Sequence, residues 1–169
     1  PNPATHGKSV RKLRRAGITV RVGVLAGCLT EMNVAFEKYI RTGMPWTVAK
    51  AAQTLDGKIA TSTGNSQWIT SLEARRFSRT LRNDFDAIMV GVDTVLKDNP
   101  ALNPSDPRKP LKKIVVDSRL RTPLQARFFQ DCDPKDCWIA TAASADPARI
   151  QWYQRRGHGV IVCPARHGR

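Results

Sequence analysis

The chain has 169 residues, of which 41% are hydrophobic and 25% charged, which suits one globular domain, or one with part of another, and excludes a disordered chain. Lysine and arginine number 28 against 14 acidic residues, and the net charge of +14 favours anionic partners such as nucleic acid or phosphorylated metabolites. No apolar run approaches the roughly 18 residues of a membrane span, and no signal peptide is recognisable, so the sequence predicts a cytoplasmic protein without a membrane partner.

The first forty-odd residues predict a helix, a strand and a second helix. The first helix is expected to end at Gly17, because glycine often follows the last turn of a helix, and a strand is expected over Ile18–Leu25. The next helix has apolar residues on one face, with Thr30 as its cap and Gly43 after its end. Pro45 discourages further helix, so we expect a linker and a domain boundary here.

The remainder of the chain predicts strands that alternate with helices. Trp46–Thr54 has the composition of a strand buried on both sides, a polar loop follows, and Thr70 with Glu73 has the form of a capping box. Further strands are expected over residues 87–92, 112–118, 137–143 and 158–163, with helices after residue 70, over 93–97 and over 146–157. The pattern is typical of an α/β fold with a largely parallel sheet.

The cysteines do not have the spacing of a metal site. Cys132 and Cys137 are separated by four residues, no Cys-x-x-Cys occurs, and the three histidines do not lie near the cysteines in a ligand pattern. The sequence therefore predicts reduced thiols, no metal and no disulfide framework, as expected in the cytosol.

The basic residues are scattered in short clusters near Arg14, Lys112 and Arg155, without a basic tail or a ladder of aromatic residues. Recognition of nucleic acid usually combines a basic groove with stacking aromatic side chains. The distribution therefore argues against a nucleic-acid partner, although a nucleic-acid-binding or scaffold fragment stays open as an alternative function.

Three predicted strands end in polar or glycine-rich segments. Ligands of parallel sheets bind at the carboxyl ends of the strands, where this chain places the loop from Thr54 to Trp68, the segment Val90–Asn103, and Asp117 with Ser118. Backbone N–H groups near Thr94 suit a phosphate, although, taken alone, the segment is better explained by simple capping of the helix by Asp93 or Thr94.

Several single residues have two readings each. Trp68 either stacks on a heterocycle or anchors the next helix in the core. Lys50 lies in an apolar stretch, either at a sheet edge or directed into a site. Asp98 is a turn residue or a hydrogen-bond acceptor, while Ser66 and Arg82 offer donors to an anionic substrate if the fold brings them together.

These segments carry a resemblance to a known family. The stretches TLDGKIATSTGNSQWITS, VGVDTVLKDNPALN and IVVDS closely resemble the reductase domain of the RibD family, the bifunctional deaminase/reductases of riboflavin biosynthesis. The order and spacing of the motifs match from Trp46 to about Ser118, and from there to Arg169 the resemblance is one of pattern only.

The resemblance implies a dihydrofolate-reductase-like fold, NADPH as the cofactor, and reduction of 5-amino-6-(5-phosphoribosylamino)uracil, a small phosphorylated pyrimidine, to its ribitylamino form. A reductase of the same fold that acts on another ribosylamine or a pterin stays open. The positions that match the family's NADPH contacts are Ala52, Trp68, Thr94, Asp98 and Ser118. The positions that match its substrate contacts are Ser66, Arg82, Leu102 and Ser105.

Lys50 also matches a family lysine near the site, and Lys50 and Asp98 are our candidates for the group that supplies a proton. Ser105 stands where some members of the family have an arginine, and Arg108 is a candidate to replace that charge.

The resemblance also implies a domain organisation. Residues 1–44 resemble the end of the family's deaminase domain with its linker, and residues 45–169 resemble the N-terminal part of the reductase domain. The zinc signature of a deaminase is absent, so we expect no deamination from this chain alone. The chain begins without methionine and stops before the family's later glutamate and glycine-rich segment, so we expect a piece of a longer product, whose incomplete sheet favours homo-oligomers.

Overall fold

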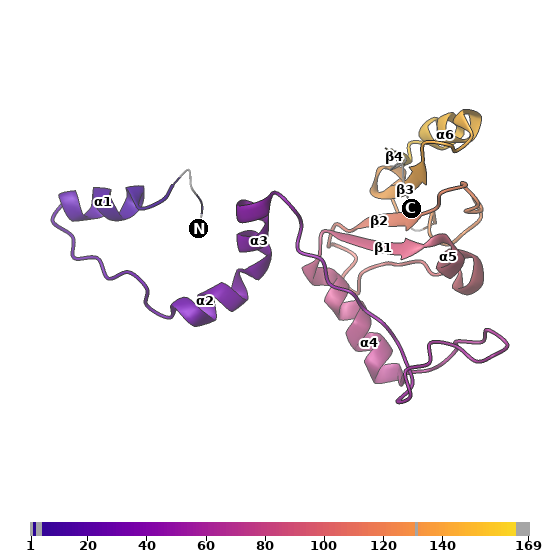
Figure 1. Ribbon diagram of the computed structural model, residues 1–169, viewed down its shortest axis with the longest axis horizontal. Coiled ribbons are helices and arrows are strands. Elements are labelled where there is room, and N and C mark those ends of the chain that lie inside the picture. The colour runs from indigo at the N-terminus through magenta and orange to yellow at the C-terminus, as the bar shows by residue number, and fades with distance from the viewer. Residues whose placement is uncertain (1, 3–4, 131, 165–169) are drawn as a thin grey trace. The chain divides into compact units, whose positions relative to one another are not determined.

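The computed structural model describes residues 2, 5–130 and 132–164. The chain divides into two compact units, the first of which ends at Ala52 while the second begins at Gln53 (Figure 1). No helix in the described part of the chain combines the length and the apolar character that crossing a membrane requires.

The first unit consists of three short helices, α1 (Lys8–Arg15), α2 (Ala26–Met32) and α3 (Val34–Thr42). The predicted ends of two helices are confirmed, because Gly17 follows α1 with φ 77° and Gly43 follows α3 with φ 67°, values that glycine adopts without strain. The second predicted helix is divided at Asn33, and Thr30 is not its cap: it lies inside α2, where its hydroxyl donates to the Ala26 carbonyl at 3.0 Å.

Two strands predicted in the first part of the chain do not form. Residues 18–25 and 46–54 have no strand hydrogen bonding, and among the described residues none before Val92 is buried. A strand satisfies its backbone groups only through a neighbouring strand, whereas a helix satisfies them within itself. The apolar composition of Trp46–Thr54 was therefore insufficient, and the prediction of a strand there was wrong.

The second unit contains a four-stranded parallel sheet, which confirms the predicted α/β class. Its strands are β1 (Ala87–Gly91), β2 (Lys112–Val116), β3 (Cys137–Ala142) and β4 (Gly159–Cys163), adjacent in chain order and parallel throughout (Figure 1). Parallel neighbours require crossover connections, and here α5 (Val92–Asp98) follows β1, while α6 (Pro147–Gln154) connects β3 to β4.

The helices of this unit begin where polar side chains cap them. The helix α4 (Leu72–Thr80) starts after Ser71, whose hydroxyl accepts from the Ala74 N–H at 3.2 Å, so the predicted cap at Thr70 was one residue early. Asp146 caps α6 by accepting from the Ala148 N–H at 2.9 Å. Two short 3-10 turns complete the unit, η1 (Leu81–Asp84) and η2 (Pro134–Asp136).

The core lies on one face of the sheet. Val115 and Ile139 are fully buried there, against Val95 of α5 and Tyr153 of α6. Successive side chains of a strand point to opposite faces, and the other face carries the exposed Met89, Val116 and Ile161. Polar residues follow the carboxyl ends of β1 and β2, among them Asp93, Thr94, Asp117 and Ser118. We call this edge of the sheet the polar edge.

Two cysteines are paired, contrary to the prediction of reduced thiols. Cys132 and Cys137 form a disulfide with their Cα atoms 7.3 Å apart, because the turn before β3 brings Cys132 back to the first residue of that strand. Cys28 and Cys163 are free. No group of metal-ligating side chains occurs among the described residues, and His167 lies outside them.

Candidate functional site

The polar edge of the sheet brings together two of the segments that the sequence singled out. Gly91 of β1 is paired in register with Val116 of β2, so α5 and the turn after β2 begin at the same edge. A salt bridge of 3.0 Å between Arg121 and Asp93 links the two segments. Thr94 and Ser118, both predicted to contact the cofactor, are exposed at this edge.

A buried carboxylate fixes the turn that carries Ser118. Asp117 is fully buried and accepts from the Thr122 backbone N–H at 2.7 Å and from the Thr122 hydroxyl at 2.8 Å. A buried carboxylate requires such donors, so Asp117 has a structural role here and fixes the turn on which the exposed Ser118 lies.

The polar loop before α4 uses many of its short side chains on its own turns. The Thr54 hydroxyl accepts from the Lys58 N–H at 2.9 Å, and the Thr61 hydroxyl accepts from the Asn65 N–H at 3.0 Å. Asn65 also accepts from the Gln67 N–H at 3.0 Å. These bonds account for a large share of the loop's polar composition without any ligand.

One residue of this loop reaches α5. The Ser66 hydroxyl donates to the Asp98 carboxylate over 3.4 Å, across 32 positions of sequence. The sequence predicted a substrate contact at Ser66 and both a cofactor contact and a proton donor at Asp98. Tertiary structure therefore places a predicted substrate residue in hydrogen-bond contact with a predicted cofactor residue.

Trp68 is an exposed ring and not a core anchor. Its side chain is 69% exposed, and the Arg75 guanidinium lies 4.1 Å from the ring centroid. Arg75 is itself held by a hydrogen bond of 2.9 Å to the Thr70 carbonyl. An exposed indole positioned in this way is available to stack on a flat heterocycle.

A small hollow of about 260 Å³ has three arginines among its lining residues, of which Arg79 and Arg127 are exposed and Arg82 is half-buried. It is lined by Arg79, Arg82, Pro100, Ala101, Leu102, Asn103 and Arg127. Arg82 is half-buried and donates to the Asn103 carbonyl at 2.8 Å. Burial, and then the positive charge of Arg79, lower the pKa of Arg82. Guanidinium groups gathered in a concave site suit an anion such as a phosphate.

The loop that lines this hollow is fastened from beneath. Lys113, in the middle of the sheet, is 2% exposed and donates to the Asn103 side-chain oxygen at 2.5 Å. Leu102, a predicted substrate residue, is 5% exposed and has φ 58°, a strained value for leucine. Asn103 thus holds both Arg82 and Lys113, and the loop between α5 and β2 has a fixed shape.

Four other residues that the sequence singled out have surroundings of their own. Lys50 and Ala52 belong to the first unit, where Lys50 is exposed and Ala52 is half-buried. Ser105 is held by Asn83, whose side-chain amide donates to the serine hydroxyl at 2.7 Å. Arg108 forms a two-point contact with Asp106, which raises the pKa of the arginine, so its charge is already matched.

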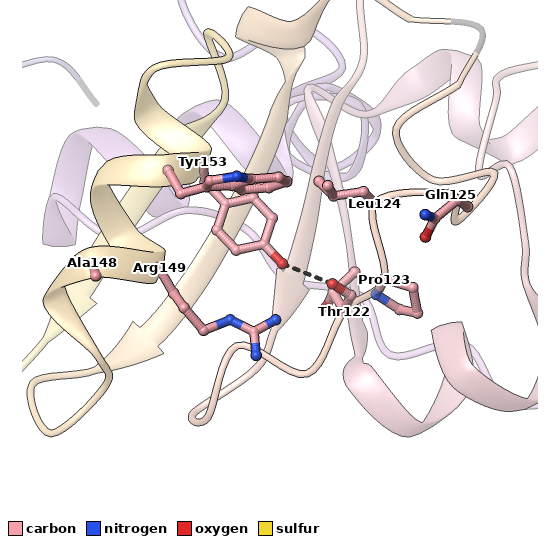
Figure 2. Close-up of a pocket in the computed structure, with 8 residues that line it drawn as sticks. Thr122, Pro123, Leu124, Gln125, Ala148, Arg149 and Tyr153 are labelled. Carbon is pink, nitrogen blue, oxygen red and sulfur yellow. Dashed lines mark hydrogen bonds between the residues drawn. The ribbon is translucent and has the colours of Figure 1, made fainter.

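A second hollow, of about 470 Å³, lies between the loop after β2 and α6 (Figure 2). Its walls are mainly apolar, and the Tyr153 hydroxyl donates to the Thr122 carbonyl at 2.7 Å on one side. Burial raises the pKa of Tyr153, against the opposing effect of the nearby Arg149. None of the predicted site residues lines this hollow.

Sequence reasoning missed four residues of the arginine hollow and its support. A signal existed for two of them: Arg79 precedes Arg82 by one helical turn, and Lys113 is a lysine inside an apolar strand. No local signal identified Asn103 or Arg127, because their positions depend on how the loops fold back on the sheet.

Comparison with known families gives a match over most of the second unit. The family model described as "RibD C-terminal domain" matches residues 45–166. The chain is 44% identical to the riboflavin biosynthesis protein RibD of Actinobacillus pleuropneumoniae, over 100% of this chain and 45% of the relative. It is 47% identical to the protein of the same name from Aquifex aeolicus, over 76% of this chain and 37% of the relative. The chain thus spans less than half the length of these relatives.

Solved structures give the same relationship. The structure of RibD from Acinetobacter baumannii matches 98% of this chain and 46% of its own, with a TM-score of 0.79 and 30% identity. A diaminohydroxyphosphoribosylaminopyrimidine deaminase/5-amino-6-(5-phosphoribosylamino)uracil reductase from Thermotoga maritima matches 98% of this chain and 51% of its own, with a TM-score of 0.74 and 29% identity.

Proposed function

This chain belongs to the RibD C-terminal domain family, and we propose that it forms part of an NADPH-dependent reductase of 5-amino-6-(5-phosphoribosylamino)uracil. The observation that carries the proposal is the contact between Ser66 and Asp98, which supports a site where a residue proposed for the substrate lies beside one proposed for the cofactor. The name of the Thermotoga maritima enzyme includes reduction of the same substrate.

The reaction that we propose is the reduction of an imine. When the ribose ring is open, C1′ and the adjoining nitrogen form a carbon–nitrogen double bond. Ring opening leaves the proton of the amine on the former ring oxygen, and bound NADPH would supply the hydride for C1′. A proton would then reach the nitrogen, which gives the ribitylamino product. The chain's own contribution is orientation of the reactants and placement of charge.

The polar edge suits a nicotinamide cofactor. Thr94 and Ser118 offer exposed hydroxyl groups on two segments that the Arg121–Asp93 salt bridge joins, and Trp68 offers an exposed ring. We assign these three residues, with Asp98, to cofactor binding. Ala52, in the first unit, remains a prediction for the same role.

The substrate side combines Ser66 with the arginine hollow. The hydrogen bond to Asp98 orients the Ser66 hydroxyl, and Arg82 and Leu102 line a cavity whose charge matches a phosphate. Asp98 and Lys50 remain the candidates for proton supply. Asp98 already contacts Ser66, a residue that we assign to the substrate.

The family relationship also suggests the origin of residues 1–44, the location of the protein and its association. We propose that residues 1–44 derive from the end of a deaminase domain, that the protein acts in the cytoplasm, and that copies of the chain associate. The uncovered sheet face with Met89, Val116 and Ile161 supports association, because apolar surface of this kind is usually covered.

Titration with NADPH tests this function against the nucleic-acid alternative. We expect saturable binding, with NADH weaker and a DNA oligonucleotide weaker still at physiological salt. Trp68→Ala and Thr94→Val should each weaken NADPH binding about tenfold. Thr80→Val is the matched control, because Thr80 is exposed on α4 and its hydroxyl donates to the Phe77 carbonyl within the helix.

Turnover is measured as substrate-dependent loss of the reduced nicotinamide absorbance. Asp98→Asn should lower kcat more than it raises KM if Asp98 supplies the proton. Steep salt-dependent binding of the oligonucleotide, together with no saturable NADPH binding, would favour the nucleic-acid alternative. NADPH binding with turnover of a different ribosylamine or a pterin would instead reassign the substrate.

A further inference from the structure

The strongest unassigned feature is the excess of positive charge in the arginine hollow. Arg79, Arg82 and Arg127 all line it, and none of the three takes part in a salt bridge found in the described part of the chain. Arg108, by contrast, is matched by Asp106 a short distance along the chain. Like charges that share a small cavity repel one another, and a bound anion offsets that repulsion.

The arginines are brought together by local structure at each position. Arg79 and Arg82 are three residues apart at the junction of α4 and η1, the spacing at which side chains lie on the same face of a helix. The backbone N–H of Arg127 donates to the Asn99 side-chain oxygen at 2.8 Å, so the residue after α5 holds the third arginine in place.

The loop opposite these side chains is rigid. The Asn103 carbonyl accepts from Arg82, its side chain accepts from the buried Lys113, and Leu102 packs into the core. A hollow with one wall held in place in this way, and with the half-buried Arg82 fixed to it, binds a phosphate at a lower ordering cost than a flexible surface does.

Ser105 stands where some family members have an arginine, so this position supplies no positive charge in this chain. Ser105 is tied to Asn83 through its hydroxyl at 2.7 Å and through its backbone N–H at 3.1 Å. Arg108, three residues on, has its guanidinium committed to Asp106 in a two-point contact and does not line the hollow. Any further positive charge at this hollow therefore comes from other residues, and Arg79 and Arg127 are the two that line it beside Arg82.

We propose that Arg79 and Arg127 act with Arg82 as a three-arginine site for the phosphate monoester of the substrate, and that they supply the charge that Ser105 lacks. The inference rests on the proposed reductase function for the identity of the ligand. The chemistry of the site is that of a terminal phosphate, which forms several charge-assisted hydrogen bonds to guanidinium groups.

The test measures binding of ribose 5-phosphate by calorimetry, with ribose and inorganic phosphate as comparison ligands. Arg79→Gln and Arg127→Gln should each weaken ribose 5-phosphate binding about ten- to hundredfold, the range for loss of one charge-assisted contact. Arg108→Gln is the matched control and should change the affinity less than about twofold, because its guanidinium serves Asp106.

Thermal unfolding provides a readout that separates ligand binding from structural support. Removing one of three like charges relieves repulsion, so Arg79→Gln should raise the melting temperature of the ligand-free chain and abolish the rise that ribose 5-phosphate produces in the wild type. A lower melting temperature, with an unchanged response to ribose 5-phosphate, would assign Arg79 to structure and overturn the inference.

A phosphate group also occurs in NADPH, so the two sources must be separated. The inference expects ribose 5-phosphate and NADPH to bind together, and expects Arg79→Gln to raise KM for the substrate while NADPH affinity stays unchanged. Loss of NADPH affinity in Arg79→Gln and Arg127→Gln would move the site to the cofactor and overturn the assignment.

Failure of the inference is distinct from failure of the proposed function. If the substrate is reduced and both variants retain the wild-type KM, the function stands and the three-arginine site is wrong. If the arginines bind ribose 5-phosphate as expected but no NADPH-dependent reduction occurs, the site stands and the reductase assignment is wrong.

Discussion

The unit that ends at Ala52 and the unit that begins at Gln53 contain helices of similar length, yet they differ in what those helices cover. The helices α3 and α4 have nine residues each. In the first unit no described residue is buried, whereas α5 and α6 of the second unit cover one face of a sheet and bury Val95 and Tyr153.

The difference shows what a parallel sheet contributes. A helix satisfies its backbone groups internally, so its hydrogen bonding does not depend on a partner segment, and the first unit has helices although none of its described residues is buried. Strands need partners, and the second unit supplies four of them in register. Apolar residues then accumulate on one face, and the polar continuations of the strands share one edge. Function is thus expected where the sheet fixes geometry.

The largest expected contrast concerns two phenylalanines. Phe128 is fully buried in the core, whereas Phe36 of α3 is 48% exposed. Phe128→Ala should lower the free energy of unfolding by about 3–5 kcal/mol, because it removes apolar contacts and leaves a cavity. Phe36→Ala should lower it by less than about 1 kcal/mol. Urea denaturation of the two variants measures both values, and equal losses would contradict the comparison.

A smaller contrast in stability is expected when a glycine is replaced by alanine in each unit. An added Cβ at Gly159 of β4 would lie 2.2 Å from the Trp138 ring, whereas at Gly27 of α2 it would meet nothing within 4 Å. Gly159→Ala should therefore cost about 1–3 kcal/mol, because the ring must shift. Gly27→Ala should be neutral or should stabilise by up to about 1 kcal/mol, through helix propensity. Melting temperatures that move in opposite directions would support the comparison.

The smallest effect is a pH dependence confined to the second unit. Burial lowers the pKa of His158, helped by the charge of Arg156 and opposed by the hydrogen bond with the Pro134 carbonyl. Below the ordinary pKa near 6.5 the unfolded chain binds a proton more readily than the folded chain does. Stability contributed by neutral His158 is therefore complete above that pH and is lost as the pH falls through the lowered value.

His158→Gln provides the control for this pH dependence. The variant lacks the titrating group, so its free energy of unfolding should fall less steeply than that of the wild type between neutral and mildly acidic pH. Parallel pH profiles of the two proteins would show that His158 does not contribute to the slope.

Local sequence was a reliable guide where one segment decides its own structure. The strands at residues 87–92 and 112–118 were predicted within a residue or two of β1 and β2, and glycines at 17 and 43 marked helix ends correctly. The α/β class followed from the alternation of strands and helices. Strands at 18–25 and 46–54 failed, because composition alone does not reveal whether a partner strand is present.

The candidate site divides in the same way. The sequence identified Ser66, Arg82, Thr94 and Asp98 by resemblance and by their place after predicted strands. Their roles remain predictions, but the contact of Ser66 with Asp98 depends on two segments 32 residues apart and was visible only in the fold. Lys50 drew attention as a lysine in an apolar stretch, yet the buried lysine is Lys113.

The sequence by itself determined three features of this protein: its excess of basic charge, the alternation of strands and helices in its second unit, and the motifs that resemble a known family. Tertiary structure decided which charges meet. Arg127 has no local pattern that distinguishes it from other exposed arginines, and it joins Arg79 and Arg82 only because Asn99 holds its backbone. Charge and hydrogen-bonding capacity are properties of single residues, whereas a cavity arises from packing between segments distant in sequence.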